Sequence, residues 1–297
     1  MNRFFVLLAY FAFVTTSSNL LADEKIRVAV TIPPIESFVS SIGGDFVEVI
    51  HLVPAGQDLH TFAPKPSKMR EMLDVKIYFK LGGIAAEKIW LDRLVNLNPS
   101  MKVMTISKGI ERIEMEGHHH HDEEGHHDEE GQSETSYATH IWLSPSNVKK
   151  MGAQILEHLL ESMLENEVLL NKNYGKFISE VVETDSAIKK ILSESDRSKG
   201  FLVFHPAWGY FAKDYGLSQV SIELEGKEPS PGELMEQLKE AKTLGIKNIW
   251  IQPQRSSRMA KSLAESLGGK LIVLDLLSTD WSNTLKKAAR EVDKSYE

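Results

Sequence analysis

The chain of 297 residues contains no cysteine. A disulfide, a thiolate-ligated metal site and a lipid anchor on an N-terminal cysteine are therefore all excluded. These absences favour a soluble, untethered protein, and they are compatible with an oxidising compartment such as the bacterial periplasm. Any metal ligands must come from histidine or carboxylate side chains.

Two other features are missing. The chain has 34 Lys and Arg against 42 Asp and Glu, a net charge of −8, and it carries no basic stripe. Nucleic acid and anionic membrane surfaces are therefore poor candidates as partners. The chain also lacks the His-Glu-x-x-His motif that commonly supplies two zinc ligands and a general base in zinc hydrolases, so we expect no enzyme.

Long apolar runs are absent except near the N-terminus, where residues 4–14 follow a basic start. This run is shorter than the roughly 20 apolar residues that a membrane span needs. The basic start, the apolar segment and Ala22 before a charged stretch are typical of a secretory signal peptide. We therefore expect residues 1–22 to be cleaved off near Ala22 and the mature protein to be periplasmic.

Residues 23–165 alternate between strand and helix patterns. β-branched apolar runs are separated from helical patterns by proline or glycine. Such alternation predicts a parallel sheet covered by helices on both faces. The predicted strands lie at 25–32, 47–53, 75–81 and 102–106, and the predicted helices at 35–42, 66–73, 87–96 and 146–164.

A stretch without proline follows at residues 166–195, with apolar residues at helical spacing. It predicts one helix about 45 Å long. Because the stretch lies between two α/β patterns, we expect this helix to be a backbone that joins two lobes.

Residues 196–297 repeat the α/β pattern of the first lobe. The chain is therefore predicted to be an α/β protein of two pseudo-symmetric lobes with parallel sheets flanked by helices, joined by one long helix. A cleft between such lobes is the default place for a ligand. The predicted strands lie at 200–205, 219–222, 247–252 and 270–274. A first predicted helix ends at Tyr215, and three more span 231–244, 256–267 and 281–292.

An acidic, histidine-rich insert interrupts the first lobe at residues 117–132. It contains no apolar residue, so we expect a mobile, solvated loop. Imidazoles beside carboxylates favour zinc, copper or nickel, whereas the alternative of a purification tag would belong at a terminus. The candidate ligands of this accessory metal loop are His118, His119, His120, His121, His126 and His127.

Three histidines outside the insert are the candidate ligands of a central site: His60, His140 and His205. Each lies in a loop after a predicted strand or beside a proline, and ligands of open α/β sheets collect at the carboxyl ends of strands. We expect His51, inside a strand, and His158, inside a helix, to take no part in this site.

The fourth ligand is expected to be a carboxylate because cysteine is absent. Asp275 emerges from the last predicted strand, whereas its rival Asp280 has the pattern of an N-cap of the final helix. Three imidazoles and one carboxylate suit tetrahedral Zn²⁺, whereas two of each would point to manganese or iron. Glu223 and Glu225, the possible general bases of a hydrolase, are expected to cap or solvate a loop.

These motifs, taken in order, resemble the periplasmic zinc-binding proteins of high-affinity zinc ABC importers. The resemblance covers nearly the whole mature chain. It rests on the combination of motifs, since any single motif would be weak. The histidine-rich insert ahead of the second ligand is similar to that family as well. The matching segments are 56–64 around His60, 140–145 from His140, 204–211 around His205, 225–234, and the turn 252–254.

The resemblance implies that the cleft holds zinc and that the protein delivers it to a membrane permease. It aligns Asp275 with an aspartate of the family, although Leu276 replaces the proline that follows there, and Leu59 replaces a proline or acidic residue before the first histidine. We expect a monomer that releases zinc by moving one ligand-bearing loop. Affinity is expected to fall as pH drops through the usual histidine range near 6.5.

Three alternatives remain open from the sequence. One is a manganese or iron receptor of the same fold, another is a secreted zinc hydrolase, and the third is a surface adhesin. The role of the insert is open too, because it could collect zinc at weaker sites and pass it inward, sense zinc sufficiency, or act only as an acidic tether.

Overall fold

The computed structural model describes residues 25–114, 137–193, 200–223, 229–255 and 258–294. The predicted signal peptide at 1–22 and the histidine-rich loop at 117–132 lie outside these residues. Among the helices of the described part, none is both long and apolar enough to cross a membrane.

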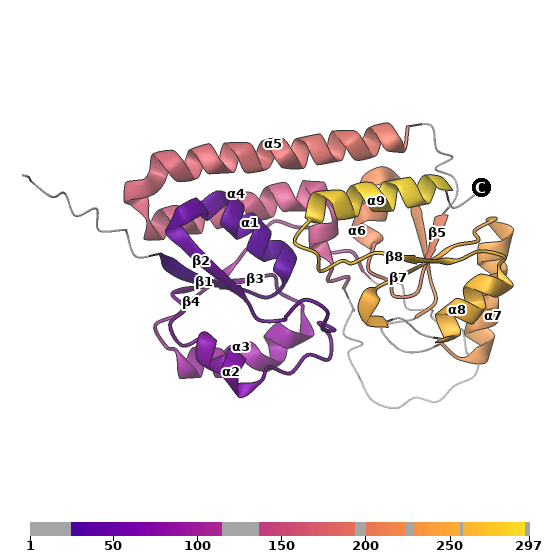
Figure 1. Ribbon diagram of the computed structural model, residues 1–297, viewed down its shortest axis with the longest axis horizontal. Helices are drawn as coiled ribbons and strands as arrows, with labels where there is room; N and C mark the ends of the chain where they lie inside the picture. Colours follow the sequence, from indigo (N-terminus) through magenta and orange to yellow (C-terminus); the bar gives the residue numbers. More distant parts are fainter. Residues whose placement is uncertain (1–24, 115–136, 194–199, 224–228, 256–257, 295–297) are drawn as a thin grey trace, which may run out of the picture.

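The first lobe is built on four parallel strands in the order β2-β1-β3-β4 (Figure 1). Side chains of one strand alternate between the faces of this sheet. Val28 and Val30 join the core on the side of the first and fourth helices, whereas Ala29 joins the core on the side of the third helix. The elements are β1 (Ile26–Val30), α1 (Pro33–Gly43), β2 (Val47–His51), α2 (Pro66–Glu71), β3 (Ile77–Lys80), α3 (Ala85–Leu97), β4 (Lys102–Thr105) and α4 (Pro145–Ser162).

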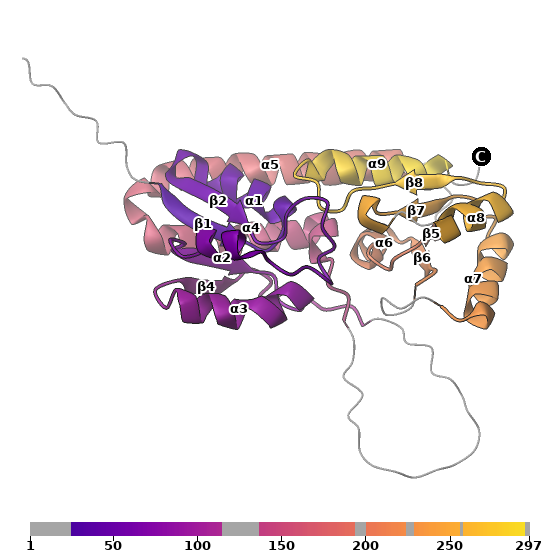
Figure 2. The same cartoon turned by 60° about the horizontal axis from the view of Figure 1, so that its bottom comes forward.

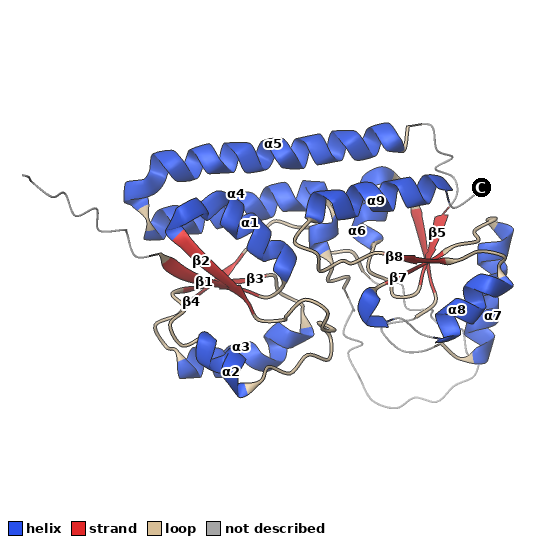
Figure 3. Ribbon diagram, in the orientation of Figure 1, coloured by secondary structure: helices blue, strands red, loops and turns tan. Residues whose placement is uncertain are grey.

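The second lobe repeats this arrangement with the strand order β6-β5-β7-β8, again all parallel (Figure 3). Leu202 packs with α7 and α8, whereas Phe201 and Val203 face the core shared with the first lobe. The equal strand order confirms the predicted two-lobed α/β fold. The elements are β5 (Gly200–Val203), α6 (Gly209–Tyr215), β6 (Ser218–Ser221), α7 (Pro231–Thr243), β7 (Ile249–Ile251), α8 (Arg258–Ser266), β8 (Leu271–Val273) and α9 (Trp281–Asp293).

Proline and glycine explain where many helices begin and end. Pro33, Pro66, Pro145 and Pro231 occupy the first turns of α1, α2, α4 and α7. Proline is favoured there because its missing N–H would have no partner within the helix and its fixed φ suits the helix. Gly216 ends α6 in the left-handed conformation, at φ 65°. The predicted boundaries therefore lie within a few residues of the observed ones.

Helix α5 (Glu167–Ile191) runs along both lobes, as Figures 1 and 2 show from two directions. Its 25 residues correspond to about 38 Å of helix. Phe177 of α5 packs on Phe38 of α1 with ring centroids 5.5 Å apart. Further along α5, the hydroxyl of Thr184 hydrogen-bonds to that of Ser282 in α9, at 2.6 Å. The predicted backbone helix therefore contacts both lobes.

One hydrophobic core continues from the first lobe into the second. At its centre Trp281 of α9 meets Phe38 edge to face, with ring centroids 5.6 Å apart. The indole N–H of Trp281 donates to the carbonyl oxygen of Trp142 (2.6 Å), and that of Trp142 donates to the carbonyl oxygen of Leu276 (2.9 Å). Because buried aromatic groups and satisfied polar groups join the lobes, a wide hinge motion would disrupt close packing.

The contact between α4 and α5 depends on a glycine. A Cβ atom at Gly152 of α4 would lie 2.4 Å from Cε1 of Phe177 in α5. We expect Gly152→Ala to lower the free energy of unfolding by about 1 to 3 kcal/mol, because the ring must move in a packed core. Urea denaturation measures this loss.

The matched control is Gly175→Ala in α5, where a Cβ atom meets nothing within 4 Å. Alanine favours a helix over glycine by about 1 kcal/mol, so this variant is expected to be as stable as the parent or more so. Equal stability of both variants would show that α4 and α5 do not pack as closely as described.

Candidate metal centre

The three predicted histidines come from three separate segments. His60 lies in the loop between β2 and α2, and His205 is the second residue after β5. His140 comes just before a 3₁₀ turn at Ile141–Leu143 that leads into α4. The fold places His60 and His205 beyond the carboxyl ends of strands, where ligands of parallel sheets collect.

The structure brings these histidines together. One nitrogen atom of each ring lies within 4.8 Å of one nitrogen of each of the others. The ring centroids are 5.0 Å apart for His60 and His205, 5.3 Å for His140 and His205, and 5.8 Å for His60 and His140. His140 and His205 are buried, whereas His60 is partly exposed. Three nearby imidazole nitrogens are the donor set of a zinc site with room for a fourth ligand.

Glu223 orients His205. Its carboxylate oxygen Oε2 lies 2.8 Å from Nδ1 of His205, and both side chains are buried. The other ring nitrogen of His205, Nε2, is buried and has no hydrogen-bond partner among the described residues. A carboxylate that accepts from Nδ1–H fixes the tautomer that leaves Nε2 as an electron-pair donor. His205 is therefore prepared to bind a metal through Nε2.

The expectation that Glu223 caps or solvates a loop is wrong. Only 4% of Glu223 is exposed, and its backbone N–H donates to the carbonyl oxygen of Phe204 at 2.8 Å. Glu223 comes just after β6, which pairs directly with β5, so the two strand ends place it beside His205. The feature of the sequence that could have indicated this role is an acidic residue just after a strand that neighbours β5. Glu225 lies outside the described residues.

Local hydrogen bonds fix the other two histidines. The carbonyl oxygen of His140 accepts from the N–H of Leu143 at 3.1 Å, and the His140 ring lies 5.1 Å from that of Trp142. The backbone N–H of His60 donates to Oδ1 of Asp58 at 2.8 Å, a local turn that sets the backbone of the first ligand.

Asp275 does not belong to the group of ligand atoms found among the described residues. It follows β8, which is two strands from β5 in the sheet, a separation of roughly 10 Å. Its Oδ1 accepts from the N–H of Leu277 at 3.0 Å. The assignment of Asp275 as a ligand stays a prediction. The N-cap expected at Asp280 is confirmed, since its Oδ1 accepts from the N–H of Asn283 at 3.4 Å.

A second buried carboxylate supports the loops of the first lobe. Glu87 of α3 accepts from the hydroxyl of Thr31 and from the backbone N–H groups of Leu81 (2.8 Å) and Gly82 (2.7 Å). Burial raises the pKa of the Glu87 carboxyl, against the effect of these donors. The sequence did not single out Glu87, because an acid in the first turn of a helix has the pattern of a solvated residue.

Two α/β lobes along one shared helix, with three histidines that converge on one point, are the arrangement of a metal-binding solute receptor. Residues 28–294 match the family described as zinc-uptake complex component A, periplasmic (ZnuA), and the chain belongs to it. The family is one of solute-binding receptors and not of enzymes. The resemblance inferred from the motifs is confirmed.

Individual relatives agree with this assignment. The zinc-binding protein AdcA of Streptococcus pyogenes serotype M3 is 30% identical over 275 residues, which cover 89% of this chain and 53% of AdcA. The chain thus spans about half the length of that curated relative.

Solved structures match over nearly the full length. A crystal structure of ZnuA has 33% identity and a TM-score of 0.83, covering 92% of this chain and 100% of the other. A zinc-bound deletion mutant of ZnuA has 32% identity and a TM-score of 0.81, covering 92% and 99%. A manganese-bound periplasmic metal-binding protein from Candidatus Liberibacter asiaticus, at 19% identity and a TM-score of 0.77 over 91% and 99%, shares the fold.

Proposed function

We propose that this chain captures Zn²⁺ between its lobes at His60, His140 and His205 and delivers it to the membrane permease of an ABC importer. The observation that carries the proposal is the convergence of three imidazole nitrogens within 4.8 Å, from segments far apart in the sequence. The zinc named in the description of the family, and in those of AdcA and the ZnuA mutant, supports the same cargo.

The donor set favours zinc over manganese. Imidazole nitrogens suit zinc, whereas manganese prefers carboxylate and carbonyl oxygen and more than four ligands. The buried acid Glu223 hydrogen-bonds to Nδ1 of His205 and would act on the metal through that ring. The fourth position is then open to water or, after a shift of the loop beyond β8, to Asp275.

Release is proposed to follow movement of the loop between β2 and α2, which carries His60. His60 is the partly exposed member of the triad, and its loop contains no helix or strand. The other two histidines are attached to segments of the shared core, which resist displacement. Withdrawal of one of three nitrogens would weaken the site without separating the lobes.

The remaining expectations belong to the same proposal. Residues 1–22 would be a signal peptide cleaved near Ala22, and the mature chain a periplasmic monomer with lobes at 23–165 and 196–297 joined by residues 166–195. The loop at 117–132 would hold zinc at weaker, exchangeable sites and pass it to the central site. The description of the family as periplasmic supports the location.

A metal competition experiment tests the cargo. The mature chain is titrated with Zn²⁺ and with Mn²⁺ against chelators of known affinity. We expect one tight zinc site and a preference for zinc over manganese of more than about 100-fold, because the three nitrogen donors match zinc. Equal or stronger binding of manganese would contradict the proposal and favour a manganese receptor of the same fold.

Delivery needs a separate measurement. Uptake of radioactive zinc into vesicles that contain the cognate permease is expected to require the mature chain, with ATP inside the vesicles. Uptake at the same rate without the chain would remove the transport role and leave a zinc-binding protein.

A further inference from the structure

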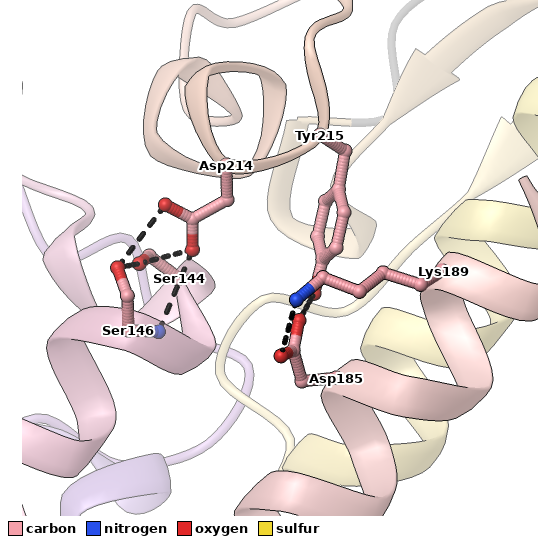
Figure 4. A network of polar contacts seen from close by, with 6 residues as sticks. All are labelled: Ser144, Ser146, Asp185, Lys189, Asp214 and Tyr215. Atoms are coloured by element: carbon pink, nitrogen blue, oxygen red, sulfur yellow. Dashed lines mark hydrogen bonds and ion pairs between the residues drawn. The ribbon is translucent and has the colours of Figure 1, made fainter.

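Helix α6 of the second lobe is attached to the first lobe through Asp214. Figure 4 shows its carboxylate over the start of α4, where it accepts hydrogen bonds from the hydroxyls of Ser144 (2.6 Å) and Ser146 (3.1 Å). The backbone N–H of Ser146 also points to it, at 3.5 Å. A carboxylate at this end of a helix is further favoured by the helix dipole.

Neighbouring residues of α6 contact other parts of the structure. The hydroxyl of Tyr210 donates to the carbonyl oxygen of Ala138 (3.2 Å) and accepts from the N–H of Ile113 (3.3 Å). The hydroxyl of Tyr215 donates to Asp185 of α5 at 3.0 Å (Figure 4). Burial, together with Asp185, raises the pKa of Tyr215, so this hydroxyl stays a neutral donor. We call Tyr210, Asp214 and Tyr215 the α6 clamp.

On each side of the Asp214 contact, the chain segment involved is close in sequence to one of the proposed metal ligands. On the first lobe, Ser144 is the N-cap of α4 and follows the 3₁₀ turn that begins after His140. On the second lobe, α6 begins after Trp208, which is buried. The backbone N–H of Ala207 donates to the carbonyl oxygen of His205 at 2.8 Å. Short, hydrogen-bonded segments therefore connect Asp214 to both histidines.

We propose that Asp214 is a positioning residue that sets the separation of His140 and His205 across the lobe interface. The proposal rests on the zinc function proposed above. The α6 clamp would hold these two imidazoles as a preformed pair before metal arrives, and His60 would close the site from its own loop. Zinc then meets a site in which only one ligand has to be ordered, which lowers the entropic cost of binding.

The decisive comparison uses the mature full chain with Asp214→Ala and, as the matched control, Lys213→Ala. Lys213 is the neighbour of Asp214 in α6 and also reaches the first lobe, but its ion pair with Glu111 is exposed and contributes little. Zinc affinity is measured by chelator competition, coordination geometry by the visible spectrum of bound Co²⁺, and folding by thermal unfolding of the metal-free protein.

We expect Asp214→Ala to weaken zinc binding about 10-fold, the usual scale for residues that orient ligands, and to change the Co²⁺ spectrum. Lys213→Ala should leave both unchanged. A purely structural role would lower the unfolding temperature of Asp214→Ala while leaving the spectrum of its bound Co²⁺ like that of the parent. That result, or unchanged zinc affinity, would overturn the proposal.

Two more variants keep the test decisive. Ser146→Ala removes one exposed donor to Asp214, so it should shift zinc affinity in the same direction by a smaller factor even if Asp214→Ala fails to fold. An unchanged Ser146→Ala beside an unfolded Asp214→Ala would count against a positioning role. His140→Ala tests the function itself: if it binds zinc like the parent, the proposed zinc site fails, whatever Asp214 does.

Discussion

Tight zinc binding is expected to disappear when His60 and His205 are both replaced by alanine. These two rings supply two of the three converging nitrogens, with centroids 5.0 Å apart. Structural zinc sites in zinc-finger peptides derive roughly 10 to 16 kcal/mol from all their ligands together. On that scale the loss of two ligands should weaken binding by more than about 1,000-fold. Chelator competition and the metal content of the purified protein measure this loss.

Two controls separate the central site from other histidines. His51→Ala removes a histidine whose Nδ1 lies 2.5 Å from Glu36 and which is not part of the triad, so zinc binding should be unchanged. Deletion of residues 117–132 should remove weaker sites and keep one tight zinc. If the tight zinc instead vanishes with the loop and survives the double substitution, the triad is not the binding site and the protein is a loop-based metal buffer.

Replacing Glu223 by alanine is expected to weaken zinc binding by about 10- to 100-fold, although Glu223 is not proposed to touch the metal. Its carboxylate is the partner of Nδ1 of His205 at 2.8 Å, and both groups are buried. Without it, the tautomer and orientation of the ring are no longer fixed. The buried Nδ1 then also loses its partner, which should lower the free energy of unfolding by about 1 to 3 kcal/mol.

Glu223→Gln separates the contribution of the hydrogen bond to His205 from that of the negative charge. The amide oxygen can still accept from Nδ1–H, so the tautomer is kept, but the negative charge that makes the ring a stronger donor is lost. We expect its zinc affinity to lie between those of the parent and of Glu223→Ala. Glu36→Ala, which removes the partner of His51, should leave zinc affinity unchanged. Zinc affinities equal to the parent's in both Glu223 variants would show that orientation of His205 does not matter.

Much of the fold could be predicted from local chemistry. Pro33, Pro145 and Pro231 mark helix starts because proline fits the first turn, and the apolar runs between them mark buried strands. The rule that ligands gather at the carboxyl ends of strands gave two of the three histidines, His60 and His205. His140 was predicted from the motif at residues 140–145, which ends in a proline. The strand rule does not apply to His140, because a 3₁₀ turn follows it.

The parts that sequence could not supply depend on which strands are neighbours. Glu223 meets His205 because β6 pairs with β5, whereas Asp275 follows β8 at the far side of the sheet. The linear pattern is the same for both acids, an acid after an apolar run, and this pattern does not tell which strand lies beside β5. Asp214 was missed for a similar reason, since its partners belong to the other lobe.

The meeting of Phe38 and Trp281 also bears on how the chain folds. These rings belong to the first and last helices of the described chain, so the core that includes both cannot close until almost the whole polypeptide is available. Contacts between such distant residues form slowly, because the entropy of closing a long loop must be lost before they stabilise anything. An emerging chain would therefore stay open until α9 arrives, and such a delay would suit the export that we propose for this chain.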